Sequence, residues 1–153
     1  MSEHVPDWVP GWVDTVDCAC WICDPTGRLV YMNDEAGQLL GVTEAALGNW
    51  CHETVASRDA DGEEFCRAGC PPWCDAMLDR PPQRRQLITR GADGQDHLSR
   101  TRVVPLTGPH DTYPWLVHCA YSQEQSSRVE SLLTRVAAEQ HTPSEPTSRP
   151  PTA

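Results

Sequence analysis

Four cysteines lie close together in the middle of the chain. They are Cys51, Cys66, Cys70 and Cys74, spaced C-x14-C-x3-C-x3-C within the segment CHETVASRDADGEEFCRAGCPPWC. Thiolate sulfur is a soft donor that suits Zn²⁺ and iron–sulfur clusters, and a bound cation would offset the repulsion between neighbouring thiolates. The sequence therefore predicts that these four cysteines bind a metal centre, with an iron–sulfur cluster slightly favoured over zinc.

The spacing leaves other uses of these thiols open. It lacks the paired C-x2-C knuckles of zinc ribbons and the C-x-x-C-H sequence of covalent haem attachment. A reversible disulfide switch fits the same residues if the thiols are accessible and of low pKa. Reduced, unliganded and partly buried thiols fit them as well. His52 is adjacent to Cys51, but adjacent side chains diverge in a helix or strand, so we favour a solvated histidine over a ligand.

The other four cysteines lie near the two ends of the predicted domain. Cys18, Cys20 and Cys23 are in and beside the first predicted strand, where Cys18 and Cys20 share one face and Cys23 takes the other. Core packing is the default interpretation of all three. A second site is the alternative, because a C-x-C pair and Cys119 on the final strand can converge within a sheet.

Turn and cap residues indicate the elements that hold the central cluster. Asn33 is a helix cap and Gly41 a helix stop, while Pro71 and Pro72 suit the first turn of a helix. The predicted order is a strand at 19–23, a strand at 29–32, helices at 35–40 and 43–48, an irregular segment at 49–68, and a helix from 70 or 71 to 79.

The second half of the chain reads as an antiparallel meander followed by a helix. Strands are predicted at 86–89, 97–106 and 113–121, and an amphipathic helix at 126–140. Its apolar stripe is expected to form a homodimer interface or to dock an unidentified signalling protein, and consists of Val129, Leu132, Leu133 and Val136. The predicted organisation is a lead-in at 1–17, a domain at 18–121, the helix within 122–140 and a disordered tail at 141–153.

Length and composition exclude several classes of protein. The chain has 153 residues, enough for one domain, and a formal net charge of −10 with arginine as its only strong base. Such a surface repels nucleic acid and anionic lipid. No apolar run approaches the ~20 residues of a membrane-spanning helix, and the N-terminus lacks a secretory signal pattern. We therefore expect a cytoplasmic protein without nucleic-acid or membrane partners.

Several local sequences together resemble the PAS domain family. They are DPTGRLVYMN, NDEAGQLLG, TEAALG and QLITRGADGQDHLSRTRVVPL, and the resemblance covers residues 18–121. It implies an α+β fold with a five-stranded antiparallel sheet, helices on one face and a C-terminal helix, serving as a sensory or dimerising module. In some PAS sensors a cysteine cluster holds an oxygen-labile iron–sulfur centre. The expected function is redox or oxygen sensing at Cys51, Cys66, Cys70 and Cys74, with output through protein–protein interaction in signal transduction or transcription regulation.

Two rival functions compete with this interpretation. The sequence LGNWC resembles the place where light-sensing LOV members carry a flavin-reactive cysteine, which would be Cys51, but those members continue with Arg-Phe-Leu-Gln and carry amide side chains on later strands. Catalytic motifs such as a phosphate loop or HExxH are missing from the sequence. A thiol oxidoreductase without metal stays open, as does a dimerisation module with a structural zinc ion or no cofactor.

Overall fold

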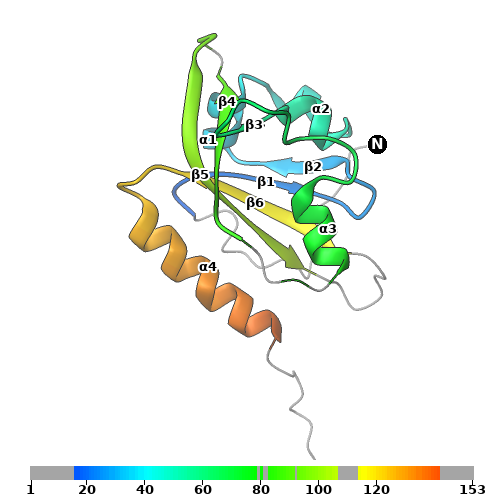
Figure 1. Ribbon diagram of the computed structural model, residues 1–153, viewed down its shortest axis with the longest axis vertical. Helices are drawn as coiled ribbons and strands as arrows, with labels where there is room; N and C mark the ends of the chain where they lie inside the picture. Colours follow the sequence, from blue (N-terminus) through cyan, green and yellow to red (C-terminus); the bar gives the residue numbers. More distant parts are fainter. Residues whose placement is uncertain (1–15, 79, 81–82, 92, 107–113, 142–153) are drawn as a thin grey trace, which may run out of the picture.

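The structure is a computed structural model that describes residues 16–78, 80, 83–91, 93–106 and 114–141. Its strands form one antiparallel sheet in the order β2-β1-β6-β5-β4-β3 (Figure 1). Their bounds are Ala19–Cys23 (β1), Leu29–Met32 (β2), Arg58–Asp59 (β3), Arg85–Arg90 (β4), Asp96–Leu106 (β5) and Trp115–Tyr121 (β6). The predicted α+β class is confirmed, and the sheet has six strands in place of the five expected.

The helices follow the predicted order with one addition. Their bounds are Asp34–Leu40 (α1), Glu44–Ala46 (η2, a 3₁₀ turn), Cys51–Val55 (α2), Pro71–Met77 (α3) and Ser126–His141 (α4). The prediction of an irregular segment at 49–68 is wrong, because that segment contains both α2 and β3. Neither carries a strong local signal: α2 has no side-chain cap, and β3 is a two-residue strand held by pairing with β4.

The caps that the sequence indicated are present and tie the helices to the sheet. The Asn33 side chain accepts a hydrogen bond from the Ala36 backbone at 2.9 Å and from the Cys20 backbone at 3.0 Å. Its amide donates to the Cys18 carbonyl oxygen at 2.8 Å. Gly41 ends α1 with a φ of 72°, in the left-handed region that favours glycine. One asparagine therefore both starts α1 and fixes it against β1.

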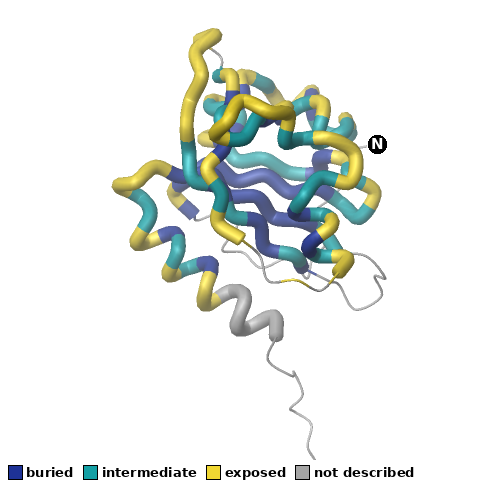
Figure 2. The backbone as a smooth tube through the Cα atoms, viewed as in Figure 1, coloured by how far each residue is buried: buried dark blue, intermediate teal, exposed yellow. Residues whose placement is uncertain are grey.

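Two apolar clusters occupy opposite faces of the sheet, as the alternation along β1 requires. We call them the α4 face and the cavity face. The α4 face carries Cys20 and Ile22 of β1 together with Val129 and Leu133 of α4. On the cavity face, the alternate β1 residues pack with the first helices, and this cluster contains Ala19, Trp21, Cys23, Leu29, Ala36, Leu40, Val55 and Ala120. Figure 2 shows that buried residues concentrate in the central strands between these layers.

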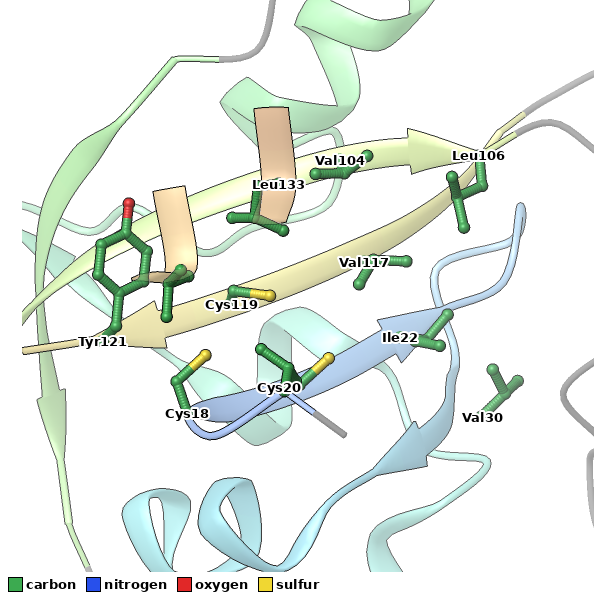
Figure 3. Packing of buried hydrophobic residues seen from close by; sticks show 12 residues of the cluster. Cys18, Cys20, Ile22, Val30, Val104, Leu106, Val117, Cys119, Tyr121 and Leu133 are labelled. Carbon is green, nitrogen blue, oxygen red and sulfur yellow. The ribbon is translucent and has the colours of Figure 1, made fainter. Parts of the chain in front are cut away.

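The stripe that was expected to mediate dimerisation packs largely on the chain's own sheet. Val129 is 1% and Leu133 0% exposed, and both belong to the α4-face cluster. Figure 3 shows Leu133 among the buried residues of β1, β5 and β6. Leu132 is partly buried against the same cluster, and the side chain of Val136 lies outside the described residues. In this conformation Val129 and Leu133 are covered within the chain and are not available as a free interface.

Polar contacts also hold α4 in place. We define the α4 clamp as Tyr121, Glu130, Arg84 and Arg102. The Tyr121 hydroxyl donates to the Glu130 carboxylate, which also lies 3.4 Å from Arg84 Nε and 3.3 Å from a terminal nitrogen of Arg102. The clamp connects the helix to β6, to β5 and to the segment before β4.

The predicted lead-in and tail fall mostly on residues 1–15 and 142–153, which lie outside the described residues. Across the part of the chain that is described, none of the helices combines the length and apolar character needed to cross a bilayer.

Candidate thiol-lined cavity

A cavity of about 440 Å³ lies between the cavity face of the sheet and the segments that cover it. Its walls come from all the central strands, from α2 and α3, from the turn between β1 and β2, and from the loop before α3. Its walls include four thiols, those of Cys23, Cys51, Cys66 and Cys70. A small molecule or ion that enters this space therefore meets sulfur on several sides.

The structure brings three of the four predicted site cysteines to this cavity. Cys51 begins α2, while Cys66 and Cys70 lie in the loop before α3, and all three are half-buried. Cys74 is exposed on α3, does not line the cavity, and its thiol donates to the Gly69 carbonyl oxygen at 3.2 Å. Among the described residues these four sulfurs do not all lie within 4.8 Å of one another. Binding of one centre by all four stays a prediction and requires movement of the loop.

A different set of donors does converge. The sulfurs of Cys23 and Cys51 and a ring nitrogen of His118 all lie within 4.8 Å of one another. His118 is on β6, where its ring stacks on Trp21 of β1 at a centroid distance of 5.3 Å and an interplanar angle of 10°. Two nitrogens in this stack, His118 Nδ1 and Trp21 Nε1, are buried without a hydrogen-bond partner.

Burial favours the uncharged forms of Cys23, Cys66, Cys70 and His118. It raises the pKa of the Cys23 thiol well above its usual range, with the neighbouring Cys51 thiol as the next cause. It also raises the pKa of Cys66 to about 11 and raises the pKa of Cys70. Burial lowers the pKa of His118 to about 4, so the imidazole is neutral at physiological pH. A cation bound between them would favour the thiolate forms and needs the neutral imidazole.

The sequence predicted neither the role of His118 nor that of Cys23. Cys23 was assigned to the core, and it is indeed 3% exposed, but its side chain also borders the cavity. The available signal was strand alternation, which places His118 on the same face of β6 as the cavity-lining Leu116. The pairing of β6 with β1, which brings His118 to Cys23, could not be read from the chain order.

The remaining cysteines pack on the other face, as the default interpretation predicted. Cys20 and Cys119 are cross-strand partners on β1 and β6, and Cys18 lies beside them (Figure 3). A hydrogen bond with the Cys119 thiol and burial together raise the pKa of Cys18. These three sulfurs are surrounded by apolar side chains of the α4-face cluster and do not line the cavity on the other face.

Comparison with known proteins agrees with the fold. Residues 13–73 match the PAS domain family profile. The light-state dimer of the fungal blue-light photoreceptor Vivid is 19% identical, with a TM-score of 0.51 over 75% of this chain and 83% of that one. A structure of photo-excited Vivid is 18% identical, with a TM-score of 0.51 over 76% of this chain and 84% of that one. No curated protein matches the chain.

The match over residues 13–73 and the likeness to Vivid agree that the described residues have the PAS fold. The likeness to Vivid shows the fold alone. What the domain can bind depends on the residues that line its cavity. Cys51 borders the cavity, at the position where the LOV resemblance placed a reactive cysteine. The described lining residues of β5 and β6, however, are Thr101, Val103, Leu116 and His118, with no amide side chain among them. The residues present do not match the LOV flavin pattern.

Proposed function

We propose that this PAS domain senses a redox or oxygen signal through the thiols of its cavity and reports it by protein–protein interaction. The observation that carries the proposal is the gathering of Cys23, Cys51, Cys66 and Cys70 around one cavity. Three of these cysteines are half-buried, so a small oxidant or ion can reach them without unfolding the domain. A location in the reducing cytoplasm, expected from the sequence, would keep them as free thiols at rest.

Strand β6 is the route by which a change in the cavity reaches the outer helix. Its residues alternate between the two faces, so His118 borders the cavity while its neighbours Val117 and Cys119 pack on the α4 face. Tyr121, at the end of the same strand, donates to Glu130 of α4. A shift of β6 caused by ligand binding or oxidation would therefore directly change how α4 packs on the sheet.

Self-association through α4 fits this route. Val129 and Leu133 are covered by the chain's own sheet, so a homodimer that uses them requires α4 to leave that sheet. In the activated state, α4 would then give up its contact with the chain's own sheet. Val129 and Leu133 would instead contact a second copy of the chain or a signalling partner. The same change would expose a large apolar surface only in the activated state.

The predicted cofactor is an iron–sulfur cluster or zinc, and three of its four predicted ligands line the cavity. Cys51, Cys66 and Cys70 would bind it, with Cys74 joining if the loop before α3 closes. A bound cluster would supply oxygen and redox sensitivity, whereas zinc would order the loop or leave a coordination position for a ligand.

Anaerobic purification of the full chain with metal and acid-labile sulfide analysis tests the cofactor. Iron with sulfide and a visible absorption spectrum supports the cluster, and zinc alone supports the second form. The sensing proposal itself is tested by hydrogen exchange of α4 before and after treatment with peroxide or air. We expect faster exchange in α4 after oxidation, and exchange unchanged in α4 while the cavity thiols are oxidised would overturn the proposal.

A metal-free thiol switch is the second candidate, favoured by the contact between the Cys23 and Cys51 thiols. With hydrogen peroxide as oxidant, one thiolate would form a sulfenic acid with release of hydroxide, and the second thiol would displace water to form the disulfide. Both cysteines are free in the structure. Mass spectrometry of peptides after peroxide treatment distinguishes a Cys23–Cys51 disulfide from a metal centre.

A further inference from the structure

We propose that Cys23, Cys51 and His118 bind a single zinc-class ion whose fourth coordination position opens into the cavity. The inference rests on the proposed sensory function, but it replaces the predicted ligands of the metal centre with another set that shares only Cys51, and it adds a class of signal. The three donor atoms lie within 4.8 Å of one another. Donors around a tetrahedral zinc ion, at bond lengths of about 2.0–2.3 Å, are separated by roughly 3.3–3.8 Å. Small side-chain adjustments therefore bring these atoms to bonding distance.

The backbone holds these three donors on different elements that are themselves fixed to one another. In the β1–β6 ladder Trp21 pairs with His118, and Cys23 pairs with the residue two positions before His118. Cys23 and His118 are thus diagonal neighbours on one face. Cys51 begins α2, and its backbone N–H donates to the Gly27 carbonyl oxygen at 2.8 Å, which docks the helix start on the turn after Cys23. Little conformational entropy remains to be lost when an ion binds.

His118 offers an independent reason to place an ion here. The residue is only 8% exposed, and its Nδ1 has no hydrogen-bond partner. Buried polar atoms without a partner are rare unless a ligand, ion or water satisfies them, and a bound ion would satisfy this nitrogen. The parallel stack on Trp21 fixes the plane of the imidazole, as metal-ligand histidines require.

The donor set and its surroundings favour an open site over a closed one. Two thiolates and one imidazole are three protein ligands, the number found where zinc keeps a position for water or a ligand. The other cavity thiols, Cys66 and Cys70, lie outside the group of atoms within 4.8 Å. Beside the group is a cavity of about 440 Å³. The class of signal that fits is a small molecule with a sulfur or nitrogen donor atom.

Trp21 would support such a ligand. Its Nε1–H is buried without an acceptor, and the residue lines the same cavity as the three donors. A ligand in the cavity that carries an acceptor atom could satisfy this donor. Trp21 also stacks on the His118 ring and so helps to hold its plane.

Cobalt(II) titration of the reduced, metal-free full chain tests the site. Co²⁺ replaces Zn²⁺ in tetrahedral sites and gives sulfur-to-cobalt charge-transfer bands that report its thiolate ligands. We expect one ion per chain, displacement by Zn²⁺, and a spectral shift when imidazole or a small thiol is added. Loss of Cys23, Cys51 or His118, as Cys23→Ser, Cys51→Ser or His118→Gln, should weaken binding by on the order of 100-fold or more, since outer-shell partners alone are worth about 10–100-fold.

The matched control is His97→Gln, which removes an exposed histidine outside the cavity. This variant should bind Co²⁺ as the unmodified chain does. If His118→Gln fails to fold, Cys51→Ser still tests the site, because Cys51 is half-buried at a helix start. Circular dichroism of each metal-free variant separates lost folding from lost binding.

Three results would overturn the inference: no Co²⁺ binding by the unmodified chain, unchanged binding in Cys23→Ser or His118→Gln, or an equal loss in Cys66→Ser or Cys70→Ser. The last would mean a closed site of four or more ligands. The sensory proposal fails on a different observation, the lack of an α4 response to oxidation. The two can therefore be rejected separately.

Discussion

Two groups of cysteines lie on opposite faces of one sheet and have different surroundings. Cys18, Cys20 and Cys119 on the α4 face are at most 1% exposed and are packed among apolar side chains. On the cavity face, Cys51 and Cys66 are half-buried beside open volume. The same side chain acts as a small apolar residue in the first place and as an accessible donor in the second. Whether a cysteine acts as a core residue or as an accessible donor therefore depends on whether its surroundings are packed side chains or an open cavity.

The length of the covering helices explains why one face is filled and the other is not. On the α4 face, one helix of 16 residues presents its stripe along the sheet. On the cavity face, the covering helices α1, α2 and α3 have 7, 5 and 7 residues, and loops join them. One or two helical turns offer few side chains to a sheet, so part of the volume stays empty.

Thiol labelling should show the largest difference between the two faces. In the reduced, metal-free chain, iodoacetamide should modify Cys74 first and then Cys51, Cys66 and Cys70. Cys20 and Cys119 should react only through global unfolding, slower by about a thousandfold or more for a domain of ordinary stability. Peptide mass spectrometry over a time course measures the rates.

The control is the same iodoacetamide time course on the chain unfolded in denaturant. All eight cysteines should then react at similar rates. Native-state modification of Cys119 as fast as that of Cys51 would show that the α4 face is not sealed.

Truncation of one leucine on each face should show the next largest difference. Leu106 of β5 is 0% exposed in the α4-face cluster, whereas Leu116 of β6 borders the cavity. We expect Leu106→Ala to lower the free energy of unfolding by about 2–5 kcal/mol. Leu116→Ala should lower the free energy of unfolding by an amount at or below the lower end of that range. The reason is that part of the Leu116 side chain already lacks packing partners.

Urea unfolding of both variants at one pH measures this difference, and an unchanged slope of free energy against urea concentration confirms that the unfolded states are comparable. Equal losses in the two variants would mean that the cavity is filled in solution.

The elements that could be predicted are those stabilised by contacts between residues close in sequence. Helix α1 was predicted with its start and end because Asn33 and Gly41 act within one turn of it. The start of α3 at Pro71 was predicted for the same reason. In contrast, β3 depends on pairing of Arg58 with Ile88, thirty residues later, and leaves no local trace.

The site divides in the same way. Cys51, Cys66 and Cys70 were found because they are close in sequence, and spacing alone suggested a common site. The convergence of Cys23 and His118 depends on β6 lying between β1 and β5 in the sheet. That order is set by the packing of both faces at once, and a single sequence does not display it.

The α4 clamp should give the smallest effect, and it tests whether the two faces communicate. Tyr121→Phe removes the hydroxyl that donates to Glu130, which should lower the free energy of unfolding by about 1–2 kcal/mol at neutral pH. Burial raises the pKa of Tyr121, and the Glu130 carboxylate raises it further. The folded chain therefore retains a proton that the unfolded chain releases above about pH 10, and stability falls as pH rises through that range.

Because phenylalanine has no proton to lose, the difference in stability between Tyr121→Phe and the unmodified chain should shrink above about pH 10. Urea unfolding on both sides of that pH measures it. Glu130→Gln is the matched control: it keeps an acceptor for the Tyr121 hydroxyl but removes the charge that Arg84 and Arg102 contact. Both variants should speed hydrogen exchange in α4 and leave exchange in β1 unchanged. Exchange in α4 at the unmodified rate in both would show that apolar packing alone seats the helix.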